Sequence, residues 1–334
     1  MPGGLGSCSG RLRSNGFSPD ISPAGPERSA AGVWIHDIAE LGRSLFCAAG
    51  RRGHRWGMRG ISAPPLRANR FGYRLGAGCA DLAPPPRAMI PQFGGMAGLE
   101  LNADIGEGWD DARLLPYVQR ASIACGGHVG DAASMARALE LCAAHGVMAG
   151  AHPSFPDLEN FGRVALAASG EDIERWVVEQ VAALRAIADA MGVALFHVKP
   201  HGALYNLAAH EPRAGRALVG AMARLPGLAL VALADTPLVH EGRARGITML
   251  EEAFADRRYL TDGRLAPRHM PGAVIDDPRA AAEQARRIAG GEALATVDGG
   301  HLVVHADTLC LHGDRDAAEV YARAVHAALR ADSA

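Results

Sequence analysis

The stretch "ALFHVKPHG", Ala194 to Gly202, contains the pattern from which the fold can be predicted. An apolar run long enough for a buried strand is followed by His197, Lys199 and His201, and then by a glycine. Alternate side chains of a strand lie on the same face, so His197 and Lys199 share one. Because burying a lysine costs several kcal/mol unless its ammonium is paired, we expect that face to be a polar barrel interior and not the apolar side beneath a helix.

Lys199 is also the only lysine of the chain, since the other 33 of the 34 Lys and Arg residues are arginines. A chain that otherwise uses arginine for its cations has kept an ammonium here. An ammonium is a compact point charge, whereas a guanidinium is planar and needs a fork-shaped site. Lys199 is therefore a candidate functional residue.

Six other apolar runs of similar length accompany this one, at residues 99–105, 121–125, 147–152, 228–233, 247–253 and 307–312. The segments between them have the punctuation of helices, most clearly after Ser169, which has Asp172 three residues on and an apolar stripe ending at Gly192. Similar signals predict helices at residues 131–146, from 236, at 277–290 and at 314–329.

Apolar strands that alternate with amphipathic helices predict a parallel sheet covered by helices, and seven strands favour a closed seven-stranded β/α barrel of TIM-like type. A doubly wound open sheet is the alternative. The first run is followed by neither G-x-G-x-x-G nor G-x-x-x-x-G-K-[ST], so the usual sequence support for a Rossmann or P-loop domain is missing.

The chain divides by composition into an extension, residues 1–97, and a barrel domain, residues 98–334. Residues 1–98 contain 18 Gly, 10 Pro and 12 Arg against 5 acidic residues, without sustained apolar periodicity, which predicts disorder or a mis-assigned start with Met89 or Met96 as the true one. The net charge of -2 argues against nucleic acid as a partner, and no apolar run approaches the ~20 residues of a membrane helix. We expect a cytoplasmic protein with a small-molecule substrate.

Most of the unusual polar residues lie where the predicted strands end or in the loops that follow. In β/α barrels the carboxyl ends of the strands carry the active site, because the strand-to-helix loops converge there. Glycines in these loops let backbone amides approach a phosphate or carboxylate. The candidate site residues are Asp104, Gly106, Glu107, Gly126, His128, Asp131, His152, His197, Lys199, His201, Asn206, Glu252, Arg257, His312 and Asp314.

Six collinear motifs resemble the LamB/YcsF family, to which the A subunit of prokaryotic 5-oxoprolinase belongs. They are "LNADIGEG", "SIACGGHVGD", "GAHPSFPDLENFGR", "HVKPHGALYN", "EAFADRRYLTDGRLAPR" with "PGAVI", and "DTLCLHGD". The resemblance covers about residues 98–330. It implies a seven-stranded β/α barrel akin to the polysaccharide deacetylases, and ATP-dependent opening of 5-oxoproline to L-glutamate, with release of ADP and phosphate, together with partner subunits B and C.

On this interpretation Lys199 steadies the transferring phosphoryl group, His197 or His201 moves the proton to the ring nitrogen, and Asp104 and Glu107 activate water or hold a metal. His128 could do either, as could His152. The glycines, Asp131, His152, Asn206, Glu252, Arg257, His312 and Asp314 would contact substrate or nucleotide, and Mg²⁺ would accompany ATP. A protein-bound divalent metal is an open question.

Two alternatives remain at the level of sequence. The first is a deacetylase-like hydrolase in which Asp104, His128 and His152 hold a metal and no ATP is needed. The second is a non-catalytic subunit that binds a lactam. The chain also departs from the family pattern: the loop after Gly108 is short, Gly127 replaces an aromatic residue, and Ser122 replaces an asparagine.

Overall fold

The computed structural model describes residues 99–313 and 317–331 of the chain. The expectations for the extension and for Asp314 lie outside the described residues.

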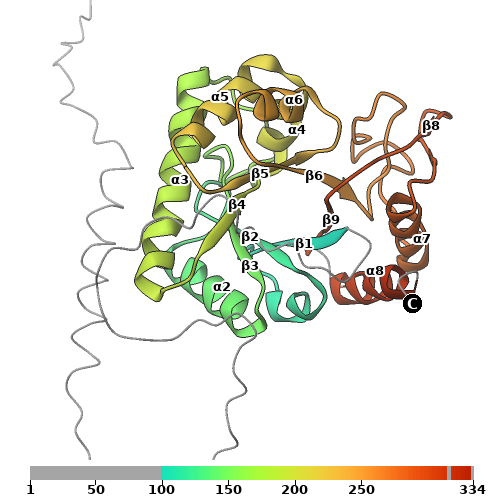
Figure 1. Cartoon of the computed structure of the whole chain (residues 1–334), viewed down its shortest axis with the longest axis horizontal. Coiled ribbons are helices and arrows are strands. Elements are labelled where there is room, and N and C mark those ends of the chain that lie inside the picture. The colour runs from blue at the N-terminus through green and yellow to red at the C-terminus, as the bar shows by residue number, and fades with distance from the viewer. Residues whose placement is uncertain (1–98, 314–316, 332–334) are drawn as a thin grey trace, which may run out of the picture. The chain divides into compact units, whose positions relative to one another are not determined.

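Seven parallel strands close into a barrel in the order in which they follow one another along the chain, as Figure 1 shows. The strands are β1 (Glu100–Ile105), β2 (Arg120–Ala124), β3 (Met148–His152), β4 (Leu195–Val198), β5 (Ala229–Leu233), β6 (Met249–Phe254) and β9 (Thr308–Leu311). Each lies within one of the seven apolar runs or begins or ends one residue beyond it. β1 pairs with β2 on one side and with β9 on the other, which confirms the closed barrel and excludes the open sheet.

Helices surround the barrel and cover its outer face (Figure 1). They are α2 (Ala132–His145), α3 (Gly170–Met191), α4 (Gly202–His210), α5 (Pro212–Ala223), α6 (Pro237–Ala244), α7 (Pro278–Ala289) and α8 (Ala318–Ala331). Two 3₁₀ turns, η1 (Asp111–Arg113) and η2 (Leu115–Tyr117), follow β1, and the short strands β7 (Leu294–Ala295) and β8 (His301–Leu302) form an antiparallel pair. None of the described helices combines the length and the apolar character needed to cross a membrane.

The helix ends are set by the residues that the sequence singled out. Asp131 and Ser169 each form a capping box with the third residue of their helix, α2 and α3. Gly146 and Gly192 end these helices in the left-handed conformation, at φ 69° each. These two helices therefore begin and end where local sequence directs.

The helices α4 and α5 were not predicted. The helix α4 starts directly at Gly202 and has no capping side chain that would mark its start. Pro212 at the start of α5 and Glu211, whose carboxylate accepts from the amides of Arg213 and Ala214, divide the two helices. The start of α4 immediately behind the strand places the end of "HVKPHG" at the barrel mouth.

Candidate functional site

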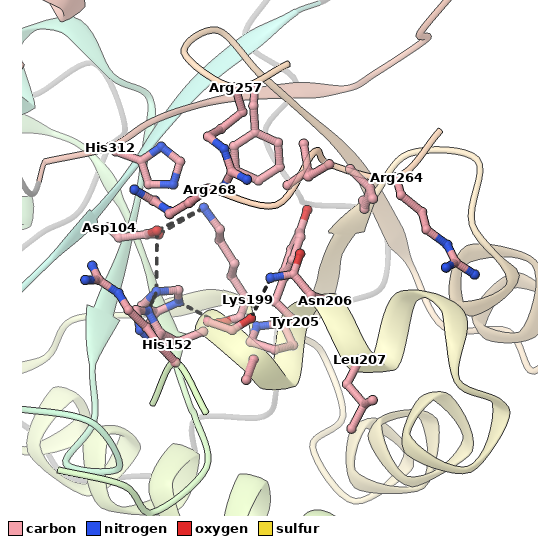
Figure 2. Close-up of a pocket in the computed structure, with 18 of the residues that line it drawn as sticks. Asp104, His152, Lys199, Tyr205, Asn206, Leu207, Arg257, Arg264, Arg268 and His312 are labelled. Carbon is pink, nitrogen blue, oxygen red and sulfur yellow. Dashed lines mark hydrogen bonds and ion pairs between the residues drawn. The ribbon is translucent and has the colours of Figure 1, made fainter. Parts of the chain in front are cut away.

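A cavity of about 760 Å³ opens at the carboxyl ends of the strands (Figure 2). Its lining combines four kinds of ionisable group: carboxylates, imidazoles, one lysine, and arginines. These groups are Asp104, Glu107, His152, Lys199, His201, His210, Glu211, His312, Arg163, Arg257, Arg264 and Arg268. The residue types and the position are those of a polar ligand site at a barrel mouth.

Lys199 lies inside the barrel, 2% exposed, with its ammonium among acceptors from three other strands. Nζ is 3.0 Å from Oδ1 of Asp104 and 2.9 Å from Oε1 of Glu252. It also donates to Oδ1 of Asn102 and to Sγ of Cys310, at 3.1 Å each. Three N–H groups thus face acceptors from four residues, and the ammonium is already satisfied by the protein.

This network sets the charges on the cavity floor. Burial alone would lower the pKa of Lys199, but the charge of Asp104, with that of Glu252, holds it well above the ordinary value. Burial would likewise raise the pKa of Asp104, but His152 and Lys199 keep it well below its usual range. Lys199 is therefore a cation and Asp104 an anion across the neutral pH range. Figure 2 shows the lysine reaching Asp104, with His152 on another side of that carboxylate.

Glu252 is fully buried beneath this pair and has a fixed set of partners. Its Oε1 accepts from Nδ2 of Asn102 at 2.9 Å, and the same amide nitrogen is 2.8 Å from the hydroxyl of Thr308. Asn102 was not recognised in the sequence. Its position two residues before Asp104 on β1, and therefore on the same face, is the signal that could have identified it.

A second group beside Asp104 consists of Glu107, His128, His152 and His201, with one ligand atom of each lying within 4.8 Å of every other. Oε1 of Glu107 is 3.0 Å from Nε2 of His128, 3.4 Å from Nδ1 of His201 and 3.7 Å from Nε2 of His152. Burial lowers the pKa of His128 and of His201 to about 4, and that of His152 well below its usual value. Three neutral imidazoles and a carboxylate are a donor set that can hold a metal ion.

His197 shares the interior face with Lys199, but it does not line the cavity. It is fully buried, its Nε2 lies 3.2 Å from the hydroxyl of Ser122, and burial holds its pKa well below the ordinary value. A Cβ atom on Gly150 would come 2.3 Å from this nitrogen, so the neighbouring strand needs glycine there. His197 is thus part of the packed barrel interior.

Arginines and His312 also border the cavity. Arg257 is 7% exposed and donates from one terminal nitrogen to the carbonyl of Ala266 at 2.7 Å, while its buried Nε has no hydrogen-bond partner among the described residues. Burial lowers its pKa to about 10, with Arg268 adding to the shift. His312 contacts both carboxylate oxygens of Asp256 through Nδ1, at 2.9 and 3.0 Å.

Arg163, Arg264, Arg268 and Asp256 were not among the predicted site residues. Each lies in a loop, and single arginines of a chain so rich in them have no distinctive sequence signal.

Other predicted residues serve local structure. Asp131 caps α2, accepting from the Ser134 amide at 2.7 Å, and it does not line the cavity. The amide of Gly106 donates to Oδ2 of Asp111 at 2.9 Å, and that of Gly126 donates to the carbonyl of Val129 at 2.9 Å. Asn206 lines the cavity, with its side-chain amide donating to the carbonyl of Gly202 at 3.0 Å.

Cys125, which follows β2, is a buried packing residue. It is 3% exposed, burial raises its pKa to about 12, and its sulfur accepts from the amide of His152 at 3.2 Å. A thiol of this pKa is protonated at neutral pH, and the thiolate is the reactive form.

The structure explains why glycine stands at position 127. A Cβ there would be 2.3 Å from Oε1 of Gln180. The Gln180 amide reaches in from α3, where its oxygen accepts from the Ser154 amide at 3.0 Å and its nitrogen donates to the Ser154 carbonyl at 2.8 Å. Gln180 therefore occupies the space that a larger residue at position 127 would require.

Comparison with known proteins places the chain among relatives of one kind. It is 46% identical over 243 residues to a protein of Chloroflexus aggregans that is named as the A subunit of 5-oxoprolinase, with 71% of this chain and 96% of the relative covered. A Thermus thermophilus protein of the same name is 44% identical over 238 residues, with 69% and 95% covered. The crystal structure of a lactam utilization protein from Thermus thermophilus superposes with a TM-score of 0.66 at 43% identity, over 70% of this chain and 96% of that one. The LamB/YcsF family model matches residues 99–334, and the chain belongs to that family.

Proposed function

We propose that this chain is the lactam-binding and ring-opening component of an ATP-dependent 5-oxoprolinase, which converts 5-oxoproline to L-glutamate with release of ADP and phosphate. The relatives' names support a 5-oxoprolinase role and, because they describe a subunit, a complex of several chains. In this proposal the partners are subunits B and C, and the complex works in the cytoplasm, where ATP is available.

The observation that carries the proposal is the cavity, whose lining brings carboxylates, imidazoles and arginines together. 5-Oxoproline carries a carboxylate on a small ring that contains a secondary amide. A site for it therefore needs a cation for the carboxylate and acid–base groups for the amide. Arg257 fits the first requirement, because it lines the cavity. A carboxylate bound there would accept charge-assisted hydrogen bonds from its guanidinium, and bonds of this kind are the strong ones.

The lactam resists hydrolysis because its amide is resonance-stabilised. Transfer of a phosphoryl group from ATP to its carbonyl oxygen releases ADP and makes the carbon electrophilic. Water then adds to that carbon, and the ring C–N bond breaks as the nitrogen takes up a proton, which leaves an acyl phosphate. A second water hydrolyses the acyl phosphate to glutamate and phosphate. His201 and His152 line the cavity beside Glu107, and this group would activate the attacking water. Mg²⁺ would enter with the nucleotide.

Lys199 supplies the fixed positive charge of the site in this proposal. Because its donors are already directed at Asp104, Glu252, Asn102 and Cys310, contact with a phosphoryl oxygen requires it to exchange one of these acceptors for the ligand. Its position relative to Asp104 also keeps that carboxylate ionised.

A hydrolase that needs no ATP is the second candidate, favoured by the Glu107, His128, His152 and His201 group. The experiment that separates the two measures glutamate and ADP formed from 5-oxoproline by the chain alone, by the partner subunits alone, and by the mixture. We expect turnover in the mixture only, with ADP and glutamate formed together. Glutamate formed by the chain alone without ATP would establish the second candidate instead, and glutamate from the partners alone would show the non-catalytic or dispensable role.

The carboxylate contact is tested by Arg257→Gln in the mixture. Removing the cation should raise KM for 5-oxoproline by about 10- to 100-fold, the scale of a charge-assisted hydrogen bond of roughly 1.5–3 kcal/mol. The adjacent Arg258 does not line the cavity, so Arg258→Gln is the matched control and should leave KM unchanged. Equal effects of the two substitutions would remove Arg257 from the site.

A further inference from the structure

The histidines beside Glu107 have their tautomers fixed by backbone carbonyls. Nδ1 of His152 lies 2.7 Å from the carbonyl oxygen of Lys199, and Nε2 of His201 lies 3.0 Å from that of Phe161. A carbonyl only accepts, so each of these nitrogens carries a proton when the ring is neutral. The opposite nitrogens, Nε2 of His152 and Nδ1 of His201, are then bare lone pairs.

These two lone pairs face each other at 3.0 Å. In these tautomers both nitrogens direct their lone pairs into the same small space, as two ligand atoms of one cation do. Oε1 of Glu107 is the third donor, 3.4 Å from Nδ1 of His201 and 3.7 Å from Nε2 of His152. The two imidazoles are 1% and 8% exposed, so water does not screen this arrangement. A cation among the three atoms could accept a lone pair from each of them.

We propose that Glu107, His152 and His201 are the protein ligands of a divalent first-row transition ion of the Zn²⁺ class. Two imidazoles and one carboxylate, with open positions on the cavity side, are a common catalytic ligand set for such ions. The carbonyls behind His152 and His201 supply the outer hydrogen bonds that orient histidine ligands in metal sites. Nitrogen ligands favour a transition ion over Mg²⁺, which prefers oxygen.

His128 is a positioning residue in this site and not a ligand. Its ring stacks on His201 with centroids 3.7 Å apart and planes only 2° from parallel. Two parallel rings at that separation cannot both direct an in-plane lone pair at one ion. Nε2 of His128 instead donates to Oε1 of Glu107 at 3.0 Å, which holds the carboxylate in place, and His128 does not line the cavity.

Asp104 is excluded as a primary ligand by its partner. Its carboxylate is bound to the ammonium of Lys199 through both oxygens, at 3.0 and 3.2 Å, and a divalent ion there would stand against a fixed positive charge. The proposed ligand set therefore shares only His152 with the set Asp104, His128 and His152 that the sequence indicated.

Metal binding is measured on the purified full chain, without partner subunits, ATP or 5-oxoproline, so that its failure is distinct from failure of the proposed function. The protein is stripped with a chelator, dialysed and titrated with Zn²⁺ against a chromophoric chelator. We expect one equivalent to bind tightly. His152→Asn and Glu107→Gln should each weaken binding by on the order of 100-fold or more, since each removes a ligand.

Two further variants separate the roles. His128→Phe keeps a stacked ring but loses the bond to Glu107, and it should weaken Zn²⁺ binding by about 10-fold, as loss of an outer-shell partner does. His312→Asn changes another cavity histidine, which is paired with Asp256, and should leave the affinity unchanged. A loss in His128→Phe equal to that in His152→Asn would contradict the ligand assignment.

The absorption spectrum of the Co²⁺-loaded wild-type chain tests the site without any variant, in case the substitutions impair folding. Nitrogen ligation at low coordination number gives intense visible bands, whereas an all-oxygen octahedral site gives weak ones. Weak bands, or wild-type Zn²⁺ binding no tighter than that of folded His152→Asn, would overturn the proposal.

Discussion

The substitution Lys199→Met tests the charge network of the barrel floor. Lys199 lies 2.9 Å from Glu252, which is fully buried, and 3.0 Å from Asp104. Methionine fills similar space but leaves two carboxylates close together without a cation. Breaking a buried ion pair by removing one partner costs about 3–5 kcal/mol, so we expect a loss of that size in the free energy of unfolding at pH 8.

The loss should depend on pH, and its sign follows from the two carboxylates. Without the ammonium the pKa of Asp104 in the folded state rises, because burial and the neighbouring carboxylate both favour its protonated form. The folded variant then holds more protons than the unfolded chain, so its stability falls as pH rises. The difference between wild type and Lys199→Met should therefore be smallest near pH 5 and grow towards pH 8.

Urea denaturation at several pH values measures this difference, and a double variant supplies the control. Glu252→Gln in the Lys199→Met background removes one uncompensated charge and keeps an oxygen that can accept from Asn102, so it should recover roughly 1–3 kcal/mol at pH 8. A loss under about 0.5 kcal/mol in Lys199→Met, or one independent of pH, would refute the argument that this lysine neutralises the floor.

Turnover of the reconstituted complex gives a separate readout, for which Lys199→Arg is the informative change. A planar guanidinium cannot direct its donors at the four acceptors that surround Nζ, so turnover should fall by about 100-fold or more, the scale of one electrostatic contact to a transition state. Near-normal turnover with arginine would show that only the charge matters at this position.

Three further predictions concern stability. Gly150→Ala places a Cβ 2.3 Å from Nε2 of His197 and should lower the unfolding free energy by about 1–3 kcal/mol. The control Gly170→Ala, where the nearest neighbours of the new Cβ are 3.8 Å away, should change it by less than about 0.5 kcal/mol. Similar values for both would contradict the close contact. Burial raises the pKa of Cys142 to about 12, so above pH 9 the unfolded chain loses a proton that the folded chain keeps. Between pH 8 and pH 10 the unfolding free energy of wild type should therefore fall by about 1.4 kcal/mol more than that of Cys142→Ala. Equal losses in the two proteins would count against the shift. A chain beginning at Met96 should fold with the same thermal midpoint as the full chain, because the family match begins at residue 99; a lower midpoint would assign the extension a part in stability.

The fold could be predicted largely from local sequence, since its signals are local. Each strand of the barrel is a short apolar run, and Asp131, Gly146, Ser169 and Gly192 cap their helices as the spacing indicated. The helix α4 was missed because no side chain caps its start, and its first residue, Gly202, has a φ of 56°. A Cβ there would be 2.6 Å from the carbonyl of Gly162, a contact between distant loops that sequence alone does not reveal.

The sequence predicted which strand ends meet at the site. It did not predict which side chains pair there. The two-residue period placed His197 and Lys199 on one face, yet only the structure separates them, with His197 against Ser122 and Lys199 against Asp104. Depth along the barrel makes this difference. Two residues along a strand span about 6–7 Å, enough to move a side chain from the packed interior to the cavity floor.

Asp104 and Glu107 illustrate the same limit for the carboxylates. Asp104 lies in β1 and Glu107 follows the end of that strand, and their residue types do not distinguish their roles. Asp104 faces the ammonium of Lys199, which satisfies its charge within the protein, whereas Glu107 faces three imidazoles that burial keeps neutral. Glu107 therefore lies among nitrogen donors, where a metal ion could bind. Lys199 pairs with Asp104, whereas the proposed metal ligands are Glu107, His152 and His201. The ammonium and a metal ion would therefore not compete for the same carboxylate.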